Sequence, residues 1–219
     1  MNGDEMNLTK EYMKTKITQI LMSRVVHIVS GVVVCVIYGL FIYAHYLTFI
    51  KTDQFVWLML CFSETLIVGM YIFRRKPQTI SIDVFDWVIA MIGSFAPLFF
   101  RPSTWGVFPI AEYLIMLGIV LQVLGLISLN SSFALVAANR QVKTHWMYQV
   151  VRHPIYASYC LILIGYVLVN TTMFNSFIYL LSMTFLGLRI IKEEKHLMLD
   201  PLYRQYTKKV RYRLIPYII

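Results

Sequence analysis

The sequence has 219 residues, of which 58% are hydrophobic and 14% are charged, and its formal net charge is +9 at pH 7. Soluble domains carry about 25% charged residues, so the composition excludes an ordinary soluble domain, a disordered chain and a disulfide scaffold. It predicts one domain embedded in a lipid bilayer. No polar surface with interleaved basic and aromatic residues suggests a nucleic-acid partner. The three cysteines are far apart, so we expect no metal site.

Four apolar stretches in the first part of the chain are candidates for single transmembrane helices, since about 20 apolar residues cross the hydrocarbon core. They cover residues 25–50, 55–73, 84–100 and 107–129. The third stretch is shorter than the others and contains Pro97 near its end. We therefore expect four transmembrane helices within residues 25–129.

The fifth apolar stretch is too long for one helix. Residues 154–188 contain no charge, and 35 residues in one helix would measure about 52 Å. The polar residues 170–172 and Asn175 interrupt this stretch near its middle. The pattern predicts a helical hairpin with arms at 154–169 and 176–191, and therefore an all-α membrane protein of about six transmembrane helices.

Basic residues are distributed unevenly between the loops of this six-helix arrangement. Eighteen Lys and Arg residues lie in the N-terminal segment, the second and fourth loops and the C-terminal segment, against Lys51 and Arg101 in the other loops. The positive-inside rule then places both termini in the cytoplasm. We expect the plasma (inner) membrane of a prokaryote, or an endomembrane in a eukaryote. Residues 1–24 form a cytoplasmic tail, and Asp200 and Pro201 predict the start of a C-terminal helix.

Two acidic residues lie inside the predicted spans. Glu64 is in the middle of the second span and Glu112 is one turn inside the fourth, and such residues usually face the interior of a bundle. They could form an ion path or be hydrogen-bonded between helices. We favour the second interpretation, because we see no basic residue at a matching depth. His27 and His45, near the ends of the first span, are interpreted as interfacial residues.

The entry to the hairpin is one candidate site. Pro154 suits the first turn of a helix, and the free backbone N–H groups of that turn, beside Arg152 and His153, would attract an anion such as a carboxylate. Tyr156 would add a ring and a hydroxyl one turn further in. The alternative is that the basic residues mark the membrane interface and that Tyr148 and Tyr156 are aromatic anchors.

The exit of the hairpin is a second candidate site. Arg189 and Glu193 are one helical turn apart, and Glu194 follows at about 100° around the helix. The cation could hold a carboxylate, and an acid could hold an ammonium group or ribose hydroxyls. The alternative is an exposed ion pair of little energetic value. The hairpin would bring both candidate sites to the same membrane face.

These motifs together resemble a known family. RHPxY opens the hairpin, RxxxEE ends it, and YxxY and a terminal RLIP follow. This order resembles the isoprenylcysteine carboxyl methyltransferases, integral membrane enzymes that use S-adenosylmethionine (SAM) and are related to phospholipid methyltransferases. The resemblance covers about residues 130–219, which would form the cofactor-binding part around the hairpin 154–191.

The resemblance also implies roles for individual residues. Arg189 would hold the substrate carboxylate. The cofactor would be bound by Gln141, Val142, Lys143, Tyr148, His153, Pro154, Ile155, Tyr156 and Glu194. The chain departs from the family pattern in the loop before Tyr148. Family members often have Ser-Gly there, and this chain has His145 and Trp146. The tryptophan could reshape the loop or the edge of the cofactor site.

The resemblance implies transfer of a methyl group from SAM to the carboxylate of a lipidic or isoprenylcysteine-like acceptor. A carboxylate is ionised at pH 7, so the reaction would need no general base. The bilayer and a lipophilic methyl acceptor would be the partners. Two alternatives remain open: a lipid amine N-methyltransferase that shares the cofactor site, and a membrane transport or scaffold protein without catalysis. The chain has no Gly-rich strand-to-helix turn typical of a Rossmann-type methyltransferase.

Overall fold

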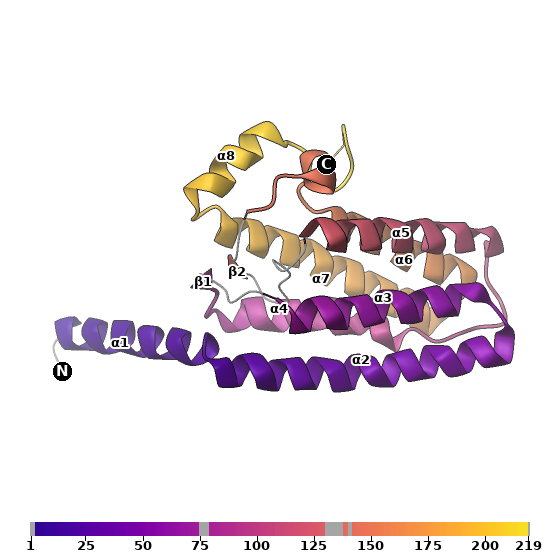
Figure 1. Cartoon of the computed structure of the whole chain (residues 1–219), viewed down its shortest axis with the longest axis horizontal. Coiled ribbons are helices and arrows are strands. Elements are labelled where there is room, and N and C mark those ends of the chain that lie inside the picture. The colour runs from indigo at the N-terminus through magenta and orange to yellow at the C-terminus, as the bar shows by residue number, and fades with distance from the viewer. Residues whose placement is uncertain (1–2, 75–78, 130–137, 140–141, 219) are drawn as a thin grey trace.

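The computed structural model describes residues 3–74, 79–129, 138–139 and 142–218. Figure 1 shows long helices lying side by side, with a small cap at one end. The helices are α1 (Gly3–Leu21), α2 (Arg24–Thr52), α3 (Phe55–Ile72), α4 (Val84–Phe95), α5 (Glu112–Leu129), α6 (Pro154–Val169), α7 (Met173–Leu197) and α8 (Pro201–Lys209). Short 3-10 helices are η1 (Ala96–Phe99), η2 (Pro109–Ala111) and η4 (Trp146–Gln149).

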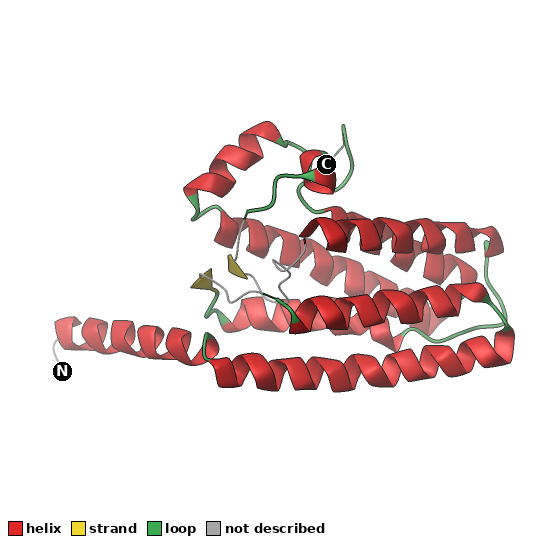
Figure 2. Ribbon diagram, viewed as in Figure 1, coloured by secondary structure: helices red, strands yellow, loops and turns green. Residues whose placement is uncertain are grey.

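The predicted helical class is confirmed, with one small addition. Two short strands, β1 (Thr79–Ile80) and β2 (Ala138–Asn139), pair antiparallel. This pairing joins the segment after α3 to the segment after α5, and Figure 2 shows it beside an otherwise helical fold. No pattern in the sequence predicted it. The N-terminal tail contains α1, which extends beyond the bundle.

Four helices are long and apolar enough to cross a membrane by their length and composition: α2, α3, α7 and the continuous segment Pro109–Leu129. Val84–Phe99 and Pro154–Val169 are shorter apolar helices. The first of these ends as a 3-10 turn from Ala96, because Pro97 has no backbone N–H to continue the α-helical ladder. The described part of the chain thus contains four candidate membrane-spanning helices and two shorter apolar ones.

The predicted hairpin is formed by α6 and α7. The first arm has the predicted bounds, whereas the second begins three residues earlier and continues to Leu197. It begins earlier because the Thr172 side chain accepts the backbone N–H of Asn175 at 3.0 Å and caps the helix. The fully buried Asn175 side chain also donates to the Asn170 carbonyl at 2.7 Å. These polar residues therefore close the turn rather than merely interrupting an apolar stretch.

Close backbone contact between α5 and α6 positions the start of the hairpin. A Cβ atom on Gly118 would lie 3.0 Å from the Ser158 carbonyl oxygen, and one on Gly165 would lie 3.0 Å from the Ala111 carbonyl oxygen. Small residues of this kind allow two helices to approach closely within a membrane. Larger side chains at these two positions would push α6 away from α5.

The C-terminal segment forms a cap over one end of the bundle, which we call the cap end (Figure 1). The opposite end, where α2 turns into α3 and α6 into α7, is the turn end. Asp200 caps α8 as predicted, accepting a backbone N–H at 2.8 Å. Beyond α8 the tail pairs with the loop before α6: Arg152 N–H donates to the Tyr212 carbonyl at 2.9 Å, and His153 N–H to that of Arg213 at 2.8 Å. The cap is thereby attached to the first motif.

Candidate active site

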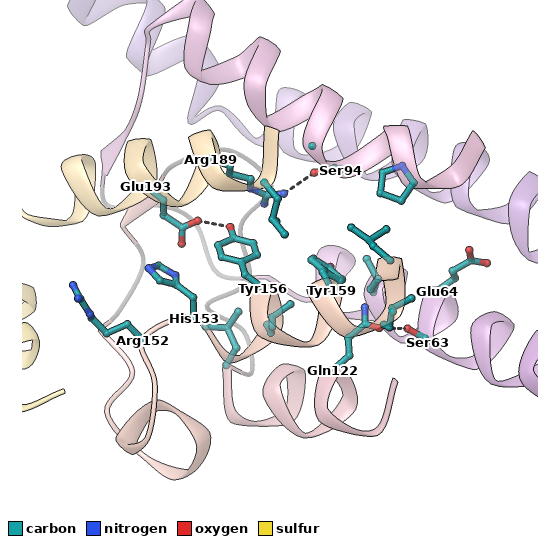
Figure 3. Close-up of a pocket in the computed structure, with 18 of the residues that line it drawn as sticks. Ser63, Glu64, Ser94, Gln122, Arg152, His153, Tyr156, Tyr159, Arg189 and Glu193 are labelled. Carbon is teal, nitrogen blue, oxygen red and sulfur yellow. Dashed lines mark hydrogen bonds between the residues drawn. The ribbon is translucent and has the colours of Figure 1, made fainter. Parts of the chain in front are cut away.

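A cavity of about 210 Å³ lies inside the bundle. A single water needs only about 10–15 Å³ on this scale, so an organic ligand fits. Tyr203 and Tyr206 of α8 line it at the cap end, and Phe100 and Tyr166 line it near the turn end. Figure 3 shows its polar residues arranged from Arg152 at one side to Glu64 at the other.

A buried carboxylate lies at the cap end. Glu194 is only 5% exposed, and its Oε1 atom lies 2.7 Å from a guanidinium nitrogen of Arg152 and 3.2 Å from His153 Nε2. Its Oε2 atom lies 2.8 Å from Nε of Arg213. A buried carboxylate is stable only when it is paired in this way. His153 at the start of the hairpin and Glu194 near its end are therefore in contact, as expected from the predicted hairpin.

Arg213 is a site residue to which the sequence analysis assigned no role. It is the first residue of the terminal RLIP motif, which contributed to the family resemblance. Nothing in the spacing predicts its partner, because the tail reaches Glu194 only by pairing with the loop before α6. Its side chain is about half exposed, at 49%, whereas that of Arg152 is 10% exposed. Arg213 is thus the outer cation of the cluster.

The two motifs also meet through Tyr156. Its hydroxyl donates to the Glu193 carboxylate, so that α6 and α7 are joined just inside the cluster (Figure 3). The His153 ring stacks on the Tyr156 ring, with centroids 5.4 Å apart and an interplanar angle of 25°. This stacking fixes both side chains at the start of α6.

Arg189 lies deeper in the bundle than Glu194. The two residues are five positions apart, or about 7.5 Å along the α7 axis. Arg189 is 8% exposed, donates to the Ser94 hydroxyl at 2.7 Å, and its guanidinium carbon lies 5.2 Å from the centre of the Tyr156 ring. The alternative interpretation of Arg189, as part of an exposed ion pair with Glu193, is therefore wrong, because Arg189 is buried. Ser94, on α4, was not predicted, because nothing in its local sequence marks it.

Tyrosines form one wall of the cap end. Tyr148, Tyr203 and Tyr206 are all buried and line the cavity. The Tyr206 hydroxyl donates to the Tyr148 carbonyl at 2.7 Å, and the Tyr203 and Tyr206 ring centroids are 5.6 Å apart. Burial raises the pKa of each of the three phenols above its usual value, so their hydroxyls stay neutral and able to donate.

The remaining predicted residues occupy different positions. Val142, Lys143 and Ile155 line the cavity. Pro154 is fully buried at the first position of α6 and is not part of the lining. Gln141 lies outside the described residues. In the part of the chain that the structure describes, no group of three His, Cys, Asp or Glu side chains could hold a metal ion.

The loop that departs from the family pattern has an unusual backbone. Trp146 has a φ of 56°, in the left-handed region that glycine adopts without steric cost. Its side chain is 68% exposed and therefore contributes little packing. Trp146 thus adopts a backbone conformation suited to glycine, at the position where the resemblance would place a glycine.

Comparison with known families agrees with these motifs. Residues 107–205 match the family model of the phospholipid methyltransferases. This family is related to the isoprenylcysteine carboxyl methyltransferases, so the resemblance inferred from the motifs is confirmed. The match includes all the predicted site residues and implies a membrane methyltransferase that acts on lipid-type substrates. A search of curated proteins finds no match.

Proposed function

We propose that this protein is a SAM-dependent carboxyl O-methyltransferase of a membrane, with the cofactor at the cap end and a lipophilic acceptor in the cavity. The observation that carries the proposal is the position of Arg189. Its cationic side chain lies between the polar cap end and the apolar part of the cavity lining, which includes Leu163 and Leu186. A carboxylate at the head of an apolar chain suits that junction, because its charge would meet the guanidinium while its tail lies among apolar side chains.

The side chains at the cap end fit the cofactor. SAM has a carboxylate, an ammonium group, ribose hydroxyls and an aromatic base. Arg152 and Lys143 are cations on the lining, Glu193 is an anion there, and the tyrosine wall offers aromatic surface. Two buried polar atoms on the lining, Nε of Arg152 and the Tyr203 hydroxyl, have no hydrogen-bond partner among the described residues. Such atoms are available to a bound polar molecule.

The assignment of cofactor residues follows the resemblance. Glu194 would hold the cofactor directly or through the two inner side chains that it orients, Arg152 and His153. Tyr156 would supply a wall of the site. The other residues that the resemblance assigns to the cofactor site are Gln141, Val142, Lys143, Tyr148, Pro154 and Ile155. SAM, when bound, supplies a methyl group that is already activated by its positively charged sulfur.

Arg189 would bind and orient the carboxylate of the acceptor. Its planar fork of N–H donors can fix both oxygens of a carboxylate, and the Ser94 hydroxyl holds one arm of the fork in place. An ionised carboxylate needs no proton removed. The contribution of the chain is therefore to orient the acceptor and to exclude water from the reaction.

One observation favours a second function, lipid amine N-methylation. Glu193 lies beside Tyr156 on the same lining, and a carboxylate there could attract an ammonium headgroup and accept its proton. Against this, the Arg189 guanidinium near the same tyrosine repels a cation. A transport or scaffold protein is the third possibility, in which the polar cluster would only stabilise the fold.

The proposed topology follows from charge. The two shorter apolar helices, α4 and α6, would complete six transmembrane segments, with both termini and the cap end in the cytoplasm. SAM would then enter from the cytoplasm and the lipid acceptor from the side. The proposed location is the plasma membrane of a prokaryote or an endomembrane of a eukaryote.

The test is transfer of a labelled methyl group from SAM by the purified protein. Three acceptors would be compared: a prenylated cysteine, a long-chain fatty acid and phosphatidylethanolamine. We expect a base-labile methyl ester on one of the two carboxylic acids. Base-stable label on phosphatidylethanolamine would support N-methylation instead. Absence of SAM binding would favour the non-catalytic interpretation.

A further inference from the structure

The cavity has a second polar region near the turn end, far from the motifs. Glu64 of α3 is 6% exposed, and His45 of α2 places its Nδ1 atom 3.1 Å from each of the two carboxylate oxygens. Both residues line the cavity. The expectation that no basic residue matches the depth of Glu64 is therefore wrong, whereas the favoured interpretation, a carboxyl group hydrogen-bonded between helices, is confirmed. Neither residue lies in the matched family segment.

Tyr166 is an independent indication of a ligand in this region. It lines the cavity and is 5% exposed, and its buried hydroxyl has no hydrogen-bond partner within the described residues. The ring is held between Trp57, with centroids 5.9 Å apart, and Phe100, with centroids 4.6 Å apart. Trp57 in turn lies 5.5 Å from the His45 ring. A buried hydroxyl without a partner is unfavourable unless a ligand or water satisfies it.

The lining between Arg189 and this region is mostly apolar. It includes Leu60, Leu98, Ile162 and Leu163. The buried Ser63 hydroxyl donates to Gln122 at 2.7 Å, so this polar pair is satisfied within the protein (Figure 3). Tyr156 and Tyr166 are ten residues apart on α6, or about 15 Å along the helix axis. The cavity is therefore polar at both ends and apolar between them.

We propose that Tyr166, Glu64 and His45 form a subsite for a neutral oxygen-containing group, a hydroxyl or a carbonyl, at the distal end of the acceptor. The placement of the acceptor's other end, at Arg189, rests on the proposed function. The group is neutral because His45 already approaches both oxygens of Glu64, and a further charge in this apolar region would be unpaired. It is polar because the buried Tyr166 hydroxyl has no partner among the described residues, and a hydroxyl or a carbonyl is a neutral group that can pair with it. The acceptor is then an amphiphile with two polar ends rather than a simple lipid tail.

The experiment compares straight-chain saturated fatty acids with their ω-hydroxy counterparts, at several chain lengths, by calorimetric titration of the purified full chain. For the wild type we expect the hydroxy acid of matching length to bind about tenfold more tightly than the plain acid. Tyr166→Phe should abolish that preference without changing the affinity for the plain acid. The control is Tyr113→Phe, at a side chain that is 70% exposed, and it should keep the preference.

The possible outcomes separate this subsite from the proposed function. Equal binding of the two acids to the wild type, or a preference that survives Tyr166→Phe, would overturn the subsite and leave carboxyl methylation standing. A preference for the hydroxy acid without methyl transfer to any carboxylic acid, the prenylated cysteine included, would support the subsite and contradict the proposed reaction. Failure of both acids to bind would overturn the subsite, and carboxyl methylation would then stand only if the prenylated cysteine is methylated. The wild-type comparison needs no variant, so poor folding of Tyr166→Phe does not prevent the test.

Discussion

Arg213 and Glu194 join the C-terminal tail to the end of α7, with the guanidinium Nε atom 2.8 Å from the carboxylate oxygen. Arg213 lies outside the segment that matches the phospholipid methyltransferases, and Glu194 lies inside it. Arg152 and His153 approach the other oxygen of the same carboxylate. The tail therefore completes a cluster whose inner members lie inside the matched segment.

The Glu194 cluster leads to a prediction about SAM affinity. Glu194→Gln keeps the size of the side chain but removes its charge, so we expect SAM binding to weaken about ten- to a hundredfold. Arg213→Ala should have a smaller effect, because Arg213 is half exposed and Arg152 and His153 still contact the carboxylate. The control is Arg204→Ala, at an exposed residue of α8, which should bind SAM like the wild type. Calorimetric titration measures all four proteins, and a loss in the control equal to that of Glu194→Gln would contradict the assignment.

Tyr156 is expected to act through both its ring and its hydroxyl. Tyr156→Phe keeps the stack on His153 and removes the donor to Glu193, so SAM affinity should fall about tenfold. Tyr156→Ala removes both contacts and should cause a larger loss, and His153→Ala should also weaken binding. Titration of SAM into each variant measures the affinities and so ranks the three losses. An affinity of Tyr156→Ala equal to that of the wild type would remove this residue from the site.

The backbone at Trp146 predicts an unusual pattern of stability. Trp146→Gly relieves the left-handed conformation but adds chain entropy to the unfolded state, so the two effects should cancel to within about 0.5 kcal/mol. Trp146→Val places a β-branched residue at positive φ and should destabilise the protein by about 1–2 kcal/mol.

Trp105→Val is the control for this comparison. Trp105 is similarly exposed, at 61%, and is not among the described residues with positive φ, so the same change should cost less there. Thermal unfolding in detergent compares the three variants. Equal destabilisation by valine at both positions would show that the backbone conformation of Trp146 carries no cost.

The proposed orientation is tested by cysteine labelling in intact cells. Single cysteines at positions 145 and 215 should be protected from a membrane-impermeant reagent, whereas those at 52 and 103 should react. Lysis should make the first two positions reactive. Labelling of position 145 in intact cells would contradict both the six-helix arrangement and the entry of SAM from the cytoplasm.

Much of the helical framework could be predicted because its signals are local. The apolar stretches, the polar interruption at 170–172 and the Asp200–Pro201 start of α8 each act on the residues beside them. The shortness of α4 follows from Pro97, which is visible in the sequence. The start of α7 was misplaced because Thr172 was interpreted as part of a break, although its side chain caps the helix.

The pairs that complete the cavity could not be predicted. Ser94 with Arg189, His45 with Glu64, and Arg213 with Glu194 each join distant segments. Whether two such side chains meet depends on how the helices rotate and cross, and a single sequence does not encode this in its spacing. The hairpin was different, because its short turn necessarily brings its two outer ends together.

The most direct test of the central claim separates the roles of Arg189 and Glu194 in one pair of measurements. SAM is titrated into purified Arg189→Ala, Arg189→Lys and Glu194→Gln, and methyl transfer to a carboxylic acid acceptor is then measured for each. We predict that both Arg189 variants bind SAM nearly as the wild type does but turn over slowly, with only partial recovery for lysine, whose point charge cannot replace the planar fork. Glu194→Gln should lose SAM affinity. Loss of SAM binding in Arg189→Ala together with normal binding in Glu194→Gln would contradict the account.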